Sequence, residues 1–414
     1  MSVTQLIRTG VLLIGLAVAF GRPAAAQTSD DFFNPEVLQR VDLWLNEQDW
    51  AKLKAAFQEN TYYPAEMVWN GISVQNVGIR SRGLGSRSAT KPGLRVDFDR
   101  YNGGQHFLGL KSYVLDNLTQ DPTGVKETTT MRFYTRLGIP APRETHTRLY
   151  VNGRYSGLYG LVESVDKTMM GRVFGSIADD VQNDGYLFEY NYVLGSPWRF
   201  TYEGSALTPY KLRFDIKTNE THAESTIWGP VEELVRLTND TSASSLEQAI
   251  ADRLDLPAFV RYISAQNFVA DFDGFNGYDG MNNFFIYRKE KSPQHVMIAW
   301  DEDNAFLQPD YPILMRIDEN VLTNKLLSLS SYRAQYFNVE LESADSAAGW
   351  LRQEMQRQLE MINDAMLADT LKPYSNADYA AARETLLAFP EARITFVRCE
   401  VAKQTGAARP SGCQ

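Results

Sequence analysis

The sequence has few of the residues that build soft-metal and thiol chemistry. Its 414 residues include two cysteines and four histidines. Two thiols cannot complete a four-cysteine zinc site or hold an iron–sulfur cluster. The histidines are too scattered for an HExxH motif, and no G-x-S-x-G motif is present. Zinc proteases, iron–sulfur proteins and serine hydrolases of the nucleophile-elbow type are therefore excluded.

An excess of positive charge is also absent. Acidic residues outnumber basic ones by 51 to 41, for a formal net charge of −10. A general nucleic-acid binder needs a basic face, so this balance argues against a nucleic-acid partner. With 44% hydrophobic residues the chain is rich enough in apolar side chains for a large core, which excludes a disordered protein.

Residues 1–26 have the pattern of a secretory signal peptide. Arg8 precedes an apolar run over 11–20, and three alanines at 24–26 provide a small-residue cleavage site. No later segment has the roughly 18 apolar residues that a membrane span requires. We therefore predict an exported protein, periplasmic or extracellular, with no membrane span after cleavage. Because the leader holds two arginines and no acids, its removal lowers the net charge to −12.

Both cysteines, Cys399 and Cys413, lie near the C-terminus. An even cysteine count in an exported chain favours one disulfide, which would clip the tail to the last helix. Two exposed thiols are the alternative.

The first half of the chain reads as sheet. Residues 28–36 look like a polar lead-in, and 40–46 alternates as an edge strand would. Further strands are predicted over 66–69, 75–81, 93–98, 113–116, 147–151, 155–163 and 186–190, with a hairpin turn at 151–154. Helical spacing marks 48–57 and 125–137, and the second helix stops at Gly138. Together these elements form a sheet-rich N-terminal lobe over 38–190.

The second half reads as helix. A polar insertion without a clear period covers 191–225. Helices are predicted over 227–238, 245–251 and 256–270, and a strand pair over 283–288 and 296–300, within a C-terminal lobe over 226–345. A helical extension fills 346–414. The fold class is therefore α+β, with two lobes and a cleft between them.

Hard oxygen ligands gather around the predicted strand pair. Asp273 follows a predicted helix, Asn283 opens one strand, and Asp301 and Asp303 follow the other. Antiparallel pairing would bring Asn283 and Asp301 to one end of the hairpin, where they suit Mg²⁺ or Mn²⁺. A separate aspartate could accept the proton of an attacking hydroxyl, as in kinases. The alternative is ordinary Asp/Asn turn chemistry.

A second group of residues is suited to phosphate. The small-residue loop over 83–88 is followed by Lys91 and Arg95, and Glu127 near the start of the next helix could pair with that cation. Glu163 ends an apolar strand where the lobes join, and either lines a nucleotide pocket or caps the following helix. Surface solvation is the alternative for each residue.

With these residues in view, the chain resembles the spore-coat CotH kinase family. The resemblance rests on motifs in the family's order, across roughly 40–310: VGIRSRG at 77–83, KPGLRVDF at 91–98, GIPAPR at 138–143, RLYVNG at 148–153, GLY at 157–159 running on to Glu163, NFFIY at 283–287 and WDED at 300–303.

The resemblance implies an atypical protein-kinase-like fold that binds ATP and Mg²⁺ and phosphorylates Ser/Thr of proteins. Asp273 matches the catalytic aspartate, and Asn283 or its neighbour Asn282 the metal-binding asparagine. Asp301 matches the metal-binding aspartate after tryptophan, and Asp303 the second acid of that motif.

The resemblance also implies that cofactor-binding residues come from the N-terminal half. Lys91 and Arg95 match the family's basic strand and Glu127 its helix-start acid, while Arg82 and Glu163 lie in its motifs. The sequence departs from the family at Ala299, where proline often stands, and at Phe306-Leu307, where Phe-Gly often follows. The spacing of ten residues from Asp273 to Asn283 is also longer than in a kinase catalytic loop, so Asp279 competes as the base.

Two functions from different classes fit these observations. One is a kinase that phosphorylates exported proteins with ATP and Mg²⁺ or Mn²⁺. The other is a non-enzymatic surface or adhesion module that keeps the kinase-like fold. The joint presence of Asp273, Asn283, Asp301 and Asp303 favours the kinase.

Overall fold

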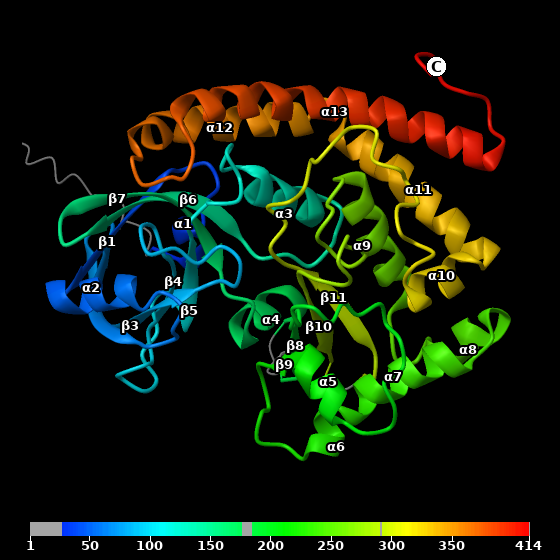
Figure 1. Cartoon of the computed structure of the whole chain (residues 1–414), viewed down its shortest axis with the longest axis horizontal. Coiled ribbons are helices and arrows are strands. Elements are labelled where there is room, and N and C mark those ends of the chain that lie inside the picture. The colour runs from blue at the N-terminus through cyan, green and yellow to red at the C-terminus, as the bar shows by residue number, and fades with distance from the viewer. Residues whose placement is uncertain (1–26, 176–183, 290–291, 414) are drawn as a thin grey trace, which may run out of the picture.

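A computed structural model describes residues 27–175, 184–289 and 292–413. The predicted leader lies outside these residues. Figure 1 shows a strand-rich region built from the N-terminal half beside a helical region built from the C-terminal half, so the fold is mixed α+β as predicted. Among the described helices, none combines the length and apolarity needed to cross a membrane.

The N-terminal strands form a closed barrel. Each neighbour pair is antiparallel except β1 and β6, whose parallel pairing closes the ring. The predicted edge strand is wrong, because β1 is bonded on both sides, to β2 and to β6. In barrel order the strands are β1 (Gln39–Leu45), β2 (Tyr63–Trp69), β3 (Ile72–Arg82), β4 (Gly93–Asp97), β5 (Ser112–Asp116), β7 (Arg154–Glu163) and β6 (Glu144–Val151).

The predicted hairpin turn at 151–154 and the predicted helix end at Gly138 are both present in the structure. Asn152 and Gly153 both have positive φ, 50° and 74°, as a tight hairpin between β6 and β7 requires. The helix α3 (Lys126–Arg136) ends before Gly138, whose φ is 73°. The helix α2 (Glu47–Ala55) starts at Asn46, whose side chain accepts from the Gln48 amide.

Two aromatic residues that precede the first strand of the barrel pack into the barrel core. Phe32 is the last residue of the short helix α1 (Ser29–Phe32) and Phe33 follows it; they are 0% and 2% exposed. The Phe32 ring lies 5.1 Å from Tyr113, 5.2 Å from Phe107 and 5.3 Å from Trp69. The prediction of a polar lead-in is therefore wrong, because two adjacent phenylalanines inside a polar stretch are part of the core.

A second sheet lies beside the barrel, in the order β11-β10-β8-β9. Its strands are β8 (Tyr186–Tyr190), β9 (Phe214–Ile216), β10 (Phe284–Arg288) and β11 (His295–Ala299). The β10–β11 pair was predicted, but β8 does not continue the first sheet as expected: it pairs with β10 and β9 instead.

The predicted polar insertion contributes to the core. The segment holds α5 (Thr208–Arg213), β9 and the start of α6 (Glu224–Ile227). Four of its aromatic side chains are buried in the same apolar cluster as the helices: Trp198, Phe200, Tyr210 and Phe214. Local periodicity is weak here because single aromatics, spaced by turns, pack against the second sheet.

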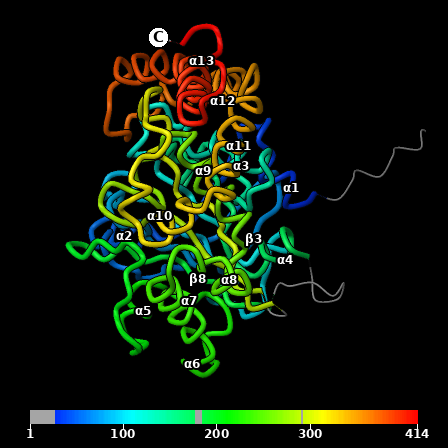
Figure 2. Tube along the Cα trace, turned by 90° about the vertical axis from the view of Figure 1, so that its right-hand side faces the viewer, coloured from blue at the N-terminus to red at the C-terminus, as the bar shows by residue number. Residues whose placement is uncertain are grey.

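The remaining helices enclose this sheet and then run across both regions. They are α4 (Lys167–Phe174), α7 (Gly229–Asp240), α8 (Leu246–Ile250), α9 (Leu256–Phe268), α10 (Val321–Leu327), α11 (Ser330–Ala347), α12 (Leu351–Ala368) and α13 (Asn376–Thr405). Figures 1 and 2 show α12 and α13 lying side by side along one edge of the molecule. α12 contacts β7 and α3, and α13 contacts α11. The predicted disulfide between Cys399 and Cys413 is confirmed.

One buried arginine ties α13 to the segments around α9. Arg393 is 0% exposed and donates to backbone carbonyls of Asn267, Phe268 and Pro309. Glu340 of α11 is buried near this charge. Burial raises the pKa of Glu340 to about 8, although Arg393 opposes the shift.

The Phe32→Ala substitution tests whether the N-terminal segment belongs to the barrel core. Truncating a fully buried phenylalanine leaves a cavity, so we expect a loss of about 3–5 kcal/mol in the free energy of unfolding. Urea denaturation measures it, with Val37→Ala as the control because Val37 is 45% exposed. Equal, small losses in both variants would contradict this role.

Glu340 should make stability depend on pH. Its folded pKa lies above the ordinary value of about 4.3, so its contribution is fully present below about pH 4 and is lost as pH rises through about 8. Glu340→Gln removes this titration. We expect the variant to gain stability relative to the native chain as pH rises, by at most about 1.4 kcal/mol per pH unit. Urea melts across that range measure it, and a pH-independent difference would overturn it.

Candidate functional site

The end of the β10–β11 hairpin brings the predicted metal ligands together. Phe284 pairs with Ala299, so Asn283 and Asp301 emerge at the same end of the two strands. Both residues have a φ of 56°, in the left-handed region that asparagine and aspartate enter more readily than other residues. The chain therefore turns sharply at both residues. Asn283 and Asp301 lie just outside the paired strands, at the same end of the hairpin.

Asp273 is held beside these residues by two amides. Its Oδ2 accepts hydrogen bonds of 3.2 Å from Nδ2 of both Asn282 and Asn283. The backbone N–H of Asn282 also donates to the Gly274 carbonyl, at 3.1 Å. Burial raises the pKa of Asp273, and the two amide bonds oppose that shift. The structure therefore joins Asp273 and Asn283 directly.

The competing base, Asp279, is placed differently. It is exposed, and its carboxylate accepts from the Tyr192 hydroxyl at the surface of the molecule. Unlike Asp273, it makes no hydrogen bond to Asn282 or Asn283 in the described structure.

Carboxylates crowd around Asp301. Burial raises the pKa of Asp301 to about 6; Arg82 opposes the shift, while Asp116 adds to it. Burial and the neighbouring Asp301 raise the pKa of Asp303 well above its usual range. Asp116 likewise raises the pKa of Asp303. Asp116, Asp301 and Asp303 are half-buried and repel one another, so the site holds more negative charge than Arg82 neutralises.

Glu127 was predicted to pair with a cation, but its main charged neighbours are carboxylates. It is 9% exposed on α3, and burial together with Glu144 of β6 raises its pKa well above the usual range. Oε1 of Glu144 is buried and has no hydrogen-bond partner among the described residues. Burial, Asp116 and Asp301 raise the pKa of Glu144 well above the usual range, whereas its hydrogen bond with Glu127 opposes that shift. Asp301 also raises the pKa of Glu127.

Lys91 is engaged away from the hairpin. It precedes β4 rather than lying on it, and its side chain is 2% exposed. Its Nζ lies 2.7 Å from Oδ2 of Asp369, which follows α12, and 5.0 Å from the Tyr159 ring centroid. Asp369 also accepts from the Leu158 amide, at 3.0 Å. This ion pair joins the barrel to the C-terminal helices.

Arg82 lies close enough to the hairpin acids to lower the pKa of Asp301. Its guanidinium lies 5.4 Å from the Trp300 ring centroid, and its Nη1 is 3.9 Å from Oδ2 of Asp116. Arg95 lies on β4 and donates to the Ser112 hydroxyl at 2.9 Å. The structure thus separates the predicted basic residues, with Arg82 beside the acids and Arg95 along the barrel wall.

Glu163 is saturated by protein partners. It is 1% exposed, and its carboxylate lies 2.6 Å from both Arg143 and Arg172. It does not cap α4, because Asp166 accepts from the first amides of that helix. Glu163 therefore fixes β7 to α4 where the barrel meets the second sheet.

Several site residues were missed from the sequence. Asp116, Glu144 and Asp369 carry no motif, and only their tertiary neighbours reveal them. Asp271 and Glu302 form a further buried pair, in which burial raises the pKa of Asp271 to about 7. The sequence offered one signal for Asp271 and Glu302, namely that they lie next to or near the predicted site residues Asp273 and Asp301 along the chain.

The donor set suits a hard divalent cation. Asn283, Asp301 and Asp303 offer amide and carboxylate oxygens, and the surrounding charge is uncompensated. In the described part of the chain, no three histidine, cysteine or acidic side chains are assembled as a metal cage. Mg²⁺ commonly binds through one or two carboxylates together with phosphates and water, so the residues fit that ion without such a cage.

Comparison with known sequences assigns the class. The site and the match across residues 79–397 define a kinase-like protein. The matched family is described as CotH kinase protein, and this chain belongs to it. Inner spore coat protein H of Bacillus subtilis (strain 168) is 21% identical over 360 residues, covering 83% of this chain and 91% of that protein.

Solved structures give weaker similarity. The proinflammatory kinase CtkA of Helicobacter pylori is 10% identical with a TM-score of 0.34, over 75% of this chain and 95% of that one. The HipA–HipB toxin–antitoxin complex of Shewanella oneidensis MR-1 with operator DNA matches at 13% identity and a TM-score of 0.32, over 81% of this chain and 64% of that chain. The family assignment rests on the sequence matches.

The Lys91–Asp369 pair gives a stability prediction. Asp369→Ala leaves a buried ammonium without its partner, which should cost about 3–5 kcal/mol of the free energy of unfolding. The double variant Lys91→Met/Asp369→Leu removes both charges and should recover part of that loss. Urea denaturation of the three chains measures it. A double variant less stable than Asp369→Ala would show that the charge itself is not the cause.

Proposed function

We propose that this chain is a bilobal, kinase-like phosphotransferase. It transfers the γ-phosphoryl group of ATP, with Mg²⁺ or Mn²⁺, to Ser/Thr hydroxyls of exported proteins. The observation that carries the proposal is the joint placement of Asp273, Asn283 and Asp301 at one end of the hairpin, with Asp273 bonded to Asn283. The family assignment supports it.

The residues divide the work of phosphoryl transfer. Asp273 orients the acceptor hydroxyl and takes its proton, because its burial makes it a better proton acceptor than an exposed aspartate. The Asn283 Nδ2 bonds Asp273, and its Oδ1 accepts no hydrogen bond from the residues that the structure describes, so Asn283 can ligate metal and position the base together. Asp301 and Asp303 would hold a divalent metal through their carboxylates, and that ion would supply positive charge to offset the phosphate charge.

Arg82 takes the phosphate-binding role that the sequence predicted for Lys91 or Arg95. Its guanidinium lies near Asp301 and stacks over Trp300, so it faces the same end of the hairpin. Arginine suits this task because its planar fork binds phosphate in a bidentate manner. Lys91 instead stabilises the docking of the C-terminal helices through Asp369.

The non-enzymatic module remains a second candidate because of two observations. Lys91 is held by Asp369, and Glu127 faces Glu144 rather than a cation, so the lysine–glutamate pair of active protein kinases is not formed. In that case the acidic cluster would bind a cation without transferring phosphate.

Phosphate transfer from labelled ATP tests the proposal. With a generic Ser/Thr-rich protein acceptor and Mg²⁺ or Mn²⁺, Asp273→Asn should lower the rate about 10²–10⁴-fold, and Asp301→Ala on the order of a hundredfold or more. Asp279→Asn is the matched control, since Asp279 is exposed and bonded to Tyr192. Arg82→Gln should weaken nucleotide binding.

Three outcomes would change the assignment. Loss of transfer in Asp279→Asn alone would move the base to Asp279. Equal transfer by Asp301→Ala and the native chain would refute the metal role of Asp301. Binding of Mg²⁺ or Mn²⁺ by the native chain, without binding of ATP, would favour the non-enzymatic module.

A further inference from the structure

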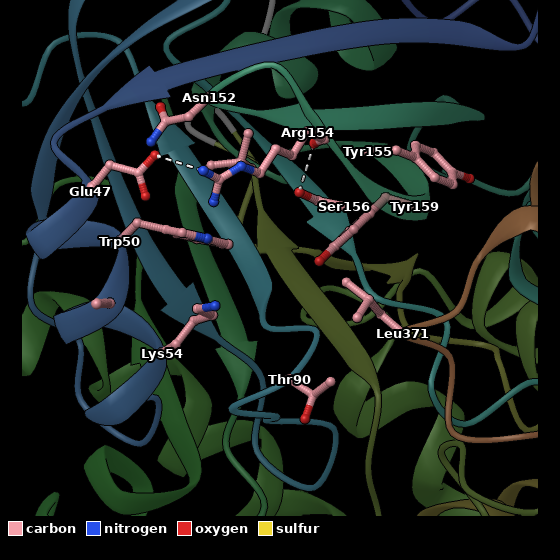
Figure 3. A pocket seen from close by; sticks show the side chains of 12 residues that line it. Glu47, Trp50, Lys54, Thr90, Asn152, Arg154, Tyr155, Ser156, Tyr159 and Leu371 are labelled. Atoms are coloured by element: carbon pink, nitrogen blue, oxygen red, sulfur yellow. Dashed lines mark hydrogen bonds and ion pairs between the residues drawn. The ribbon is translucent and has the colours of Figure 1, made fainter.

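A cavity lies at the barrel, away from the hairpin site. Its volume is about 260 Å³, and none of its lining residues belongs to the acidic cluster. Figure 3 shows Trp50 and Lys54 extending from α2 toward the β6–β7 hairpin, with Thr90 and Leu371 on the opposite side. The wall therefore combines a capping helix, a tight hairpin and the loop that follows α12.

Several side chains that line the cavity carry hydrogen-bond donors. The Trp50 indole N–H, the Lys54 ammonium and the Thr90 hydroxyl have no hydrogen-bond acceptor among the described residues. The Lys54 Nζ lies 5.5 Å from the Trp50 ring centroid, with no carboxylate of the described chain within ion-pair distance. Asn152 uses its Oδ1 to accept from the Leu45 amide, at 2.9 Å, which leaves its Nδ2 as a donor. A ligand rich in oxygen acceptors would satisfy these groups.

The net charge of the wall is positive. Arg154 and Lys54 face one carboxylate, Glu47, which lies 3.7 Å from Arg154. Both partners of that pair are largely exposed, at 79% and 64%, so the pair is weak and easily rearranged. An anionic group on the ligand would be favoured beside Lys54, and Glu47 would oppose it.

The remaining wall is aromatic and firmly held. Tyr159 donates to the Pro92 carbonyl at 3.1 Å, and Tyr155 donates to the Ala365 carbonyl at 2.9 Å. The Leu371 amide is bonded to Asp369, at 2.9 Å. Because these residues are fixed by the barrel and by the buried Lys91–Asp369 pair, the cavity is formed before a ligand arrives.

We propose that this cavity binds a sugar ring that carries an anionic group. The apolar C–H face of a pyranose packs against the Trp50 indole, and its hydroxyl oxygens accept from the Thr90 and Asn152 donors. The anionic group lies beside Lys54 and Arg154. The volume of about 260 Å³ is just below the usual range of ligand pockets, which favours a single ring. This binding is independent of phosphate transfer.

Calorimetric titration of the full chain tests the proposal. Glucuronate carries a carboxylate and glucose 6-phosphate a phosphate, and we expect saturable binding of at least one of them. Glucose should bind at least about tenfold more weakly because it lacks the charge, and acetate and inorganic phosphate because they lack the ring. The stronger of the two anionic sugars identifies the anionic group. Titrating Asp273→Asn should give the same affinities, which separates this site from the hairpin.

Variants of α2 localise the binding. Lys54→Gln should weaken the anionic sugar about tenfold, and Glu47→Gln should strengthen it by removing a like charge. Lys52→Gln is the matched control, because Lys52 is on the same helix but pairs with Asp49 at 3.1 Å. Trp50→Ala should abolish binding, and Lys54→Gln keeps the test valid if that variant unfolds. No saturable binding of either anionic sugar, or equal affinity in Lys54→Gln, would overturn the proposal.

Discussion

The structure depends on holding several buried or half-buried carboxylates close together where the barrel meets the second sheet. Asp301, Asp303, Glu127 and Glu144 all have raised pKa values, and burial is the largest cause for each. Arg82 is the one cation that lowers the pKa of Asp301 among its main influences. Such an arrangement is unfavourable unless protons or a cation compensate the charge. Proton sharing and metal binding are therefore alternative ways to stabilise the same site, and the family assignment favours metal together with nucleotide.

The elements around this site explain how the crowding is tolerated. Glu163, with Arg143 and Arg172, fixes β7 to α4, and the β10–β11 register fixes the ends of both strands. On the opposite side the C-terminal helices are attached through buried charges: the Lys91–Asp369 pair and the hydrogen bonds of Arg393. The C-terminal extension is thus part of the scaffold that positions the site. This also gives Lys91 a structural role in a position where the family resemblance implied contact with nucleotide.

The strengths and failures of sequence reasoning have physical causes. The β10–β11 hairpin, the α3 stop at Gly138 and the disulfide were predicted because local turn, cap and cysteine chemistry specify them. The path of β8, the closure of the barrel by β1 and the burial of Phe32 were missed, because each depends on pairing or packing between segments far apart in the chain. Trp198 and Tyr210 were missed for the same reason, since their segment has no local period.

By itself the sequence determined the α+β class, the family and the residue types of the site, because hydrophobic period, turn residues and the ordered motifs are local properties of the chain. Only the tertiary structure decided which charges meet. It joined Asp273 to Asn283, paired Lys91 with Asp369, placed Glu127 against Glu144 and left Arg82 beside the acids. Charge pairing is decided by the fold because it depends on distance and desolvation in space, and neither can be read from separation along the chain.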